Sequence, residues 1–181
     1  MLTPTARRTY APRVETPVQR CWSNHGRISV ISAITISPRR NRLGLYFMIL
    51  PDNTGAKAAD MIPFLRPLLH HLGSKLSICW DRGRIHDYSL AVRKWLTKQN
   101  GIRFERFPPF APDLNPDEYV WSYAKYARLC NYAAPNMTEL RKRIDEELKH
   151  LAKNSDLLQS FIDHAKLMRK NNKSLCNYRN Q

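Results

Sequence analysis

Apolar and polar positions along the chain predict a hairpin near the N-terminus. The β-branched run at residues 28–36 and the apolar run at 43–50 predict two strands joined by a turn. Residues 58–72 then repeat their apolar positions with a helical period. Pro63 and Pro67 fall inside this repeat and argue against an unbroken helix, because proline removes a backbone donor.

The rest of the chain alternates helices and strands. Asn136 and Ser155 are the predicted N-caps of the last two helices. The order of hairpin, helix, strand, helix, strand and helix predicts an α/β domain with one mixed sheet. The elements before those two helices are predicted as a strand at 76–80, a helix at 88–99, a strand at 102–107 and a helix at 118–129.

A proline-rich stretch, residues 106–121, connects the last predicted strand to the next helix. Asn115 is a favourable N-cap, and Pro116 falls at the first helical position, where a missing N–H costs nothing. Glu118 follows in the first turn, where the helix dipole favours a carboxylate. The spacing leaves two interpretations open. Glu118 is either a functional carboxylate or the second half of a capping box with Asn115.

Asp81 stands in a comparable place, directly after the strand at 76–80. If that strand and the one at 102–107 are parallel, Asp81 and Glu118 lie at one edge of the sheet. Two carboxylates brought together repel each other unless a cation lies between them. Oxygen ligands without a His/Cys cluster suit Mg²⁺ or Mn²⁺. The alternative for Asp81 is a turn-capping role after the strand.

The net charge of the chain indicates the kind of partner that it binds. The chain has 181 residues, 43% of them hydrophobic, which suits one folded domain, but its net charge is +15. Such a balance indicates a polyanionic partner, above all nucleic acid. The four cysteines are far apart, so a structural zinc site is not predicted. No apolar run suits a signal or membrane segment, and reduced thiols in a cytoplasmic compartment are expected.

Two segments, Trp80–His86 and Pro108–Trp121, resemble the catalytic domain of mariner-type transposases and of their bacterial insertion-sequence relatives. The resemblance implies an RNase H-like fold with a DDE or DDD triad. It implies divalent metal, hydrolytic DNA strand cleavage and then strand transfer. It also implies a bacterial, nucleoid-associated protein, with the catalytic domain at residues 1–167 and a basic tail at 168–181.

The resemblance assigns Asp81 to the second triad carboxylate and Glu118 to the third, both as ligands of Mg²⁺ or Mn²⁺. Arg82 stands where the family pattern often has Asn or a small polar residue, and this cation is a candidate DNA contact. Lys125, seven residues after Glu118, is another candidate contact on the same helix face. Its alternative is a plain surface lysine. His86 matches the family's histidine, and a structural role is expected for it.

The first triad Asp is expected shortly before the Arg8–Pro12 segment, on the first central strand of the sheet. No acid precedes Glu15, which falls in the wrong place, so the chain is expected to lack that strand and to be catalytically silent alone. Three interpretations follow: an N-terminally truncated transposase domain, a non-catalytic nucleic-acid-binding remnant, or a subunit complemented by another chain or an upstream fragment. Asp113 and Asp117 are not expected to be ligands, because the family's acid matches Glu118.

Overall fold

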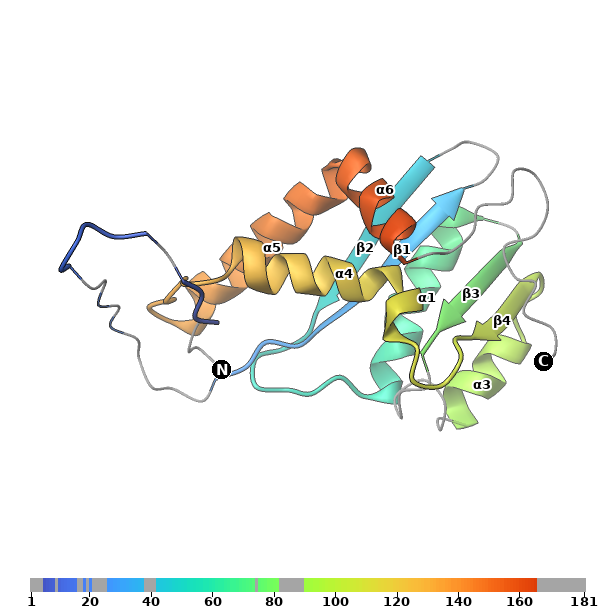
Figure 1. The fold of residues 1–181 in the computed structure, drawn as a ribbon. Helices are drawn as coiled ribbons and strands as arrows, with labels where there is room; N and C mark the ends of the chain where they lie inside the picture. The colour runs from blue at the N-terminus through green and yellow to red at the C-terminus, as the bar shows by residue number, and fades with distance from the viewer. Residues whose placement is uncertain are drawn as a thin grey trace.

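The computed structural model describes residues 5–8, 10–15, 18, 20, 26–37, 42–73, 75–81 and 90–165. Helices flank two separate pairs of strands, which gives an α/β architecture (Figure 1). The elements are β1 (Val30–Ser37), β2 (Arg42–Ile49), α1 (Ala58–Leu72), β3 (Leu76–Trp80), α3 (Leu90–Thr97), β4 (Ile102–Arg106), the 3₁₀ turn η1 (Pro112–Leu114), α4 (Pro116–Tyr123), the π-helical segment η2 (Ala124–Arg128), α5 (Met137–Lys153) and α6 (Ser155–His164).

The predicted hairpin is confirmed, with its strand ends shifted by one or two residues. β1 and β2 pair antiparallel, with Val30 opposite Ile49. Alternation along β1 sends Ile31 and Ala33 to one hydrophobic cluster, whereas Val30 and Ile34 belong to the other. Helices therefore cover both faces of the hairpin, and every residue of β1 is at least partly buried.

β3 and β4 pair parallel, with Leu76 opposite Ile102, which is the condition under which the sequence analysis expected Asp81 and Glu118 at one edge. The expected single mixed sheet is wrong for the part of the chain that is described, because β1 and β3 do not pair and each strand pair forms its own sheet. In Figure 1 the arrows of β1 and β3 point in opposite directions. Each of these two strands thus has one edge that pairs with no described strand.

Helix α1 runs unbroken across Pro63 and Pro67, which corrects the doubt that the sequence raised. Both prolines lie on the exposed side of the helix, so the carbonyls that lose a donor can bond to water. The opposite side buries Met61, Phe64, Leu65 and Leu68. Burial of this apolar stripe outweighs the two missing hydrogen bonds.

Two hydrophobic clusters lie on opposite faces of the hairpin. The first cluster combines residues of α1 and α3 with residues of both sheets, so both strand pairs pack against the same two helices. The second packs α4, α5 and α6 against β1 and β2. No described helix has the length and apolar character needed to cross a bilayer.

The predicted caps hold at one helix and shift at another. Asn136 caps α5, with its Oδ1 accepting from the Glu139 N–H at 2.8 Å. Asn154, not Ser155, caps α6, because its Oδ1 accepts from the Leu157 N–H at 3.0 Å. Asn is as good an N-cap as Ser, and here it stands one position earlier. The predicted tail at 168–181 lies outside the described residues.

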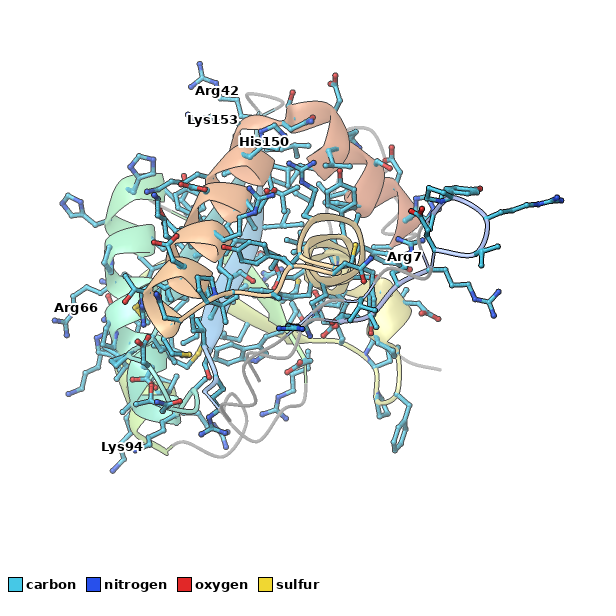
Figure 2. All side chains as sticks on the ribbon, turned by 90° about the vertical axis from the view of Figure 1, so that its left-hand side faces the viewer. Arg7, Arg42, Arg66, Lys94, His150 and Lys153 are labelled. Carbon is cyan, nitrogen blue, oxygen red and sulfur yellow. The ribbon has the colours of Figure 1, made fainter. Side chains whose placement is uncertain are left out.

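Basic side chains surround much of the molecule. Figure 2 shows Arg42, His150 and Lys153 gathered at one end of the structure, while Arg66 and Lys94 point outward along another side. Arg7 docks the N-terminal segment onto the loop after η2: its N–H donates to Asn131 Oδ1 at 2.8 Å. The labelled basic side chains thus lie on several faces of the described part of the chain.

Candidate active site

The start of α4 fixes the position of Glu118. Asn115 Oδ1 accepts from the Asp117 N–H at 3.2 Å, so Asn115 is the N-cap that the sequence predicted. The Asn115 N–H, which a capping box would direct to Glu118, instead donates to the Pro112 carbonyl at 2.9 Å. Glu118 is exposed. The hydrogen bond that a capping box would require between Glu118 and the Asn115 N–H is therefore not formed. The Glu118 carboxylate is available for another role.

A cleft of about 180 Å³ opens beside this helix start. It brings Asp81 and Glu118 together, since both acids line it. The parallel ladder extends up to this point, where the Phe107 N–H donates to the Trp80 carbonyl at 3.0 Å. Asp81 thus follows directly where the ladder ends, at the same edge as the loop that leads to α4. The other lining residues are Phe107, Pro108, Pro109, Phe110, Ala111, Pro112 and Asn115.

Asp117 has a role that the sequence analysis missed. Its Oδ2 accepts from Ser32 Oγ at 2.6 Å and from Trp121 Nε1 at 3.1 Å. Its Oδ1 is buried and has no hydrogen-bond partner in the structure. The carboxyl therefore bonds α4 to the middle of β1. A polar residue, Ser32, among the apolar positions of a buried strand was the signal available in the sequence.

Burial raises the pKa of the Asp117 carboxyl above its usual value, although the hydrogen bonds from Ser32 and Trp121 oppose this shift. The negative charges of Glu118 and Asp81 raise the pKa of Asp117 further. The three acids are thus close enough to interact electrostatically. Only Asp81 and Glu118 line the cleft.

The remaining predicted site residues fall in different places. Arg82 and His86 lie outside the described residues. Lys125 is exposed in η2, whose π-helical turn departs from the α-helical spacing that placed it on the Glu118 face, so that shared face stays a prediction. Asp113 is exposed in η1. Within the described ranges, no three His, Cys, Asp or Glu side chains form a group that could hold a metal ion.

A charged network fixes the far end of the α4–η2 unit. Glu147 of α5 is buried and accepts from Arg128 at 2.6 Å, and Arg143 lies 2.7 Å from the same carboxylate. The two arginines are only partly buried, so each keeps contact with solvent. One acid thereby connects η2 to α5, while Asp117 connects the start of α4 to β1.

Comparison with known proteins places the chain in a family. The pattern of the family described as "DDE superfamily endonuclease" matches residues 2–141, well over half of the chain. None of the curated proteins compared with the chain matches it.

Solved structures share the fold. The Mos1 transposase paired-end complex with left transposon end has a TM-score of 0.61 at 17% identity, covering 91% of this chain and 49% of the other. The Mos1 strand transfer complex has a TM-score of 0.60 at 18% identity, covering 88% and 46%. The catalytic domain of Mos1 mariner transposase has a TM-score of 0.54 at 16% identity, covering 77% and 78%. The chain spans about half the length of the transposase in the two complexes.

Proposed function

Because this chain belongs to the DDE superfamily endonucleases, we propose that it is the catalytic domain of a DNA transposase. The reaction would be metal-dependent strand cleavage followed by strand transfer. The observation that carries the proposal is the cleft that Asp81 and Glu118 line together at the edge of a parallel strand pair. Open α/β sheets bind ligands in the crevice outside the carboxyl ends of their strands, which is where this cleft lies.

Asp81 and Glu118 would hold Mg²⁺ or Mn²⁺. Mg²⁺ is commonly bound by one or two carboxylates, with waters and substrate phosphates as its other ligands, so the donor set of this cleft fits one ion. Such an ion supplies activation of the attacking water and stabilisation of the leaving oxygen. Asp117, with both its bonds directed to Ser32 and Trp121, would position Glu118 rather than bind metal.

The first triad Asp would come from a strand between β1 and β3. A strand antiparallel to β1 and parallel to β3 would use the open edge of each and unite the two pairs into one mixed sheet, which is supported by the opposite directions of β1 and β3. We infer that an upstream segment or a second chain supplies it. The chain alone would then lack one metal ligand and would not cleave DNA.

The DNA backbone would be held by the basic surface. A net charge of +15 suits a polyanion, and neutralised phosphates release counterions. Lys125 and Arg82 are the proposed contacts nearest the site in sequence. The Mos1 paired-end complex contains a left transposon end by its description, and transposon ends and target DNA are the proposed partners here.

A nicking assay tests the function. DNA carrying the ends of the element is incubated with Mg²⁺ or Mn²⁺ and either the 181-residue chain or the chain extended by its upstream segment. We expect nicking only with the extended chain, and its loss with Glu118→Gln. Nicking by the extended chain that survives Glu118→Gln would refute the assignment of the site. Nicking by the short chain that Glu118→Gln abolishes would show that the first carboxylate lies within these residues.

A second function is favoured by one observation, the lack of a three-ligand metal group among the described residues. In that case the chain is a nucleic-acid-binding remnant without chemistry. It would bind DNA as tightly as the extended chain does, and neither form would nick DNA in any divalent metal.

A further inference from the structure

Phe110 is presented to solvent in a conformation that its side chain does not favour. The ring is completely exposed, at 103% of its reference area. Its backbone φ is +58°, in the left-handed region that bulky residues rarely adopt. Packing cannot compensate for this strain, because a fully exposed ring buries no surface in the folded chain.

The loop around Phe110 is stiff. Pro108, Pro109 and Pro112 restrict the backbone on both sides of the ring, and the segment ends in the 3₁₀ turn η1. The Leu114 N–H closes that turn by donating to the Ala111 carbonyl at 3.2 Å. The loop therefore holds the ring outward rather than letting it fold back onto the protein.

The loop that carries Phe110 lies beside the two candidate acids. Phe110 lines the same cleft as Asp81 and Glu118. An exposed aromatic ring on a strongly basic protein has the two features that bind single-stranded nucleic acid, a stacking surface and charge that attracts the backbone. Inside a duplex both faces of each base are already stacked, so away from a duplex end only an unpaired base can accept the ring.

We propose that Phe110 stacks on an unpaired nucleobase of a DNA strand end held at the Asp81–Glu118 cleft. This inference rests on the proposed function, since it requires DNA at that cleft. It adds a preference for DNA with unpaired bases beside the phosphodiester to be cleaved or joined. In this proposal, the strained backbone of Phe110 serves to direct the ring toward the DNA.

Binding is measured with fluorescent oligonucleotides in EDTA, so that no cleavage contributes. Three probes are compared: a blunt duplex, the same duplex with an unpaired overhang, and the single strand, with 2-aminopurine at the unpaired positions. Phe110→Ala should weaken binding to the overhang and single strand at least about fivefold, and should remove the quenching of 2-aminopurine. Binding to the blunt duplex should change by less than about twofold, and Phe110→Trp should retain both signals.

Two further variants separate stacking from folding and from exposed aromatic surface in general. Phe110→Gly should raise the melting temperature, because glycine adopts positive φ freely, and should still lose the stacking signal. Tyr126→Ala removes an exposed ring that does not line the cleft, and should leave all three affinities unchanged.

Each remaining outcome would overturn the inference. Equal losses on blunt and overhang DNA would make Phe110 a non-specific contact, and an unchanged overhang affinity would remove it from the DNA surface. Failure of the unmodified chain to bind any of the three DNAs would refute the proposed function together with the stacking.

Discussion

At the scale of residues, the two neighbouring acids at the start of α4 have opposite environments. Asp117 is bonded to Ser32 and Trp121, with its second oxygen buried. Glu118 is exposed and lines the cleft with Asp81. One residue of chain turns a side chain by roughly 100° around a helix, so adjacent positions face different surroundings. Asp117 therefore serves the position of the helix, and Glu118 faces the cleft.

The structure predicts that Glu118 contributes nothing to capping. Glu118→Ala should change the free energy of unfolding by less than about 0.5 kcal/mol, because the Asn115 N–H already bonds to Pro112. Urea denaturation measures this value. Asn115→Ala is the matched control and should cost about 1 kcal/mol, since it removes a real cap. An equal loss for Glu118→Ala would restore the capping-box interpretation.

The pKa of Asp117 gives a pH dependence. Burial raises that pKa in the folded state above its usual 3.8, so stability is fully present below pH 3.8 and is lost as the pH rises through the folded value. Asp117→Asn keeps an oxygen for Ser32 and Trp121 without the charge. At neutral pH and in EDTA, it should be more stable than the unmodified chain by about 1–3 kcal/mol. Urea denaturation across pH should show this difference shrinking toward zero in acid; a constant difference would contradict the raised pKa.

At the scale of elements, one carboxylate fixes each end of the α4–η2 unit. Asp117 connects the start of α4 to β1, and Glu147 of α5 binds Arg128 at the end of η2. The π-helical turn at Ala124–Arg128 is an uncommon geometry and places Arg128 toward α5. Glu147 there has two arginine partners, of which Arg143 also lies over the ring of Tyr132, 5.7 Å from its centroid. The position of the cleft residue Glu118 thus depends on packing against α5 as well as on β1.

Glu147→Ala should destabilise the chain by about 3 kcal/mol, because it leaves two cationic side chains without their shared acid. The partial exposure of both arginines keeps the loss at the lower end of the range for buried pairs. Glu146→Ala, an exposed acid one position earlier on α5, is the control and should stay within about 0.5 kcal/mol. Chemical denaturation followed by circular dichroism compares the two, and equal small losses would show that the network is dispensable.

At the scale of the whole molecule, hydrophobic contacts with helices hold the two strand pairs together. The cluster under α1 and α3 includes Ile31 of β1 and packs against Ile78 of β3, so both sheets rest on the same helices without hydrogen bonding to each other. Open strand edges readily accept another strand. The further strand that we propose between β1 and β3 would pair with these two edges.

Charge at this scale predicts the mode of DNA binding. The affinity for a blunt duplex should fall at least about tenfold between 50 and 200 mM salt, because each phosphate contact releases counterions. Lys125→Ala should reduce the slope of log Kd against log salt by about one if Lys125 contacts a phosphate. Lys149→Ala is its control, since Lys149 pairs with Asp145 at 2.6 Å. Affinity that is insensitive to salt would contradict the nucleic-acid interpretation of the net charge.

The sequence by itself determined the local elements and the family. Apolar periodicity located the hairpin, α1 and the parallel strands, and short-range hydrogen bonding at Asn115 and Asn136 set two helix starts. These features depend on residues within a few positions of each other, which is why pattern reasoning finds them. The motif around Glu118 likewise indicated the DDE superfamily.

Only the tertiary structure decided the relations between distant segments. Prolines in α1 were tolerated because a buried stripe on the far side of the helix outweighs the lost bonds. Glu118 has no capping role because the Asn115 N–H donates to the Pro112 carbonyl, and Asp117 accepts a hydrogen bond from Ser32 on a strand 85 positions away. The burial of the Asp117 carboxyl and the absence of pairing between β1 and β3 depend on which surfaces meet in space, which no local pattern encodes.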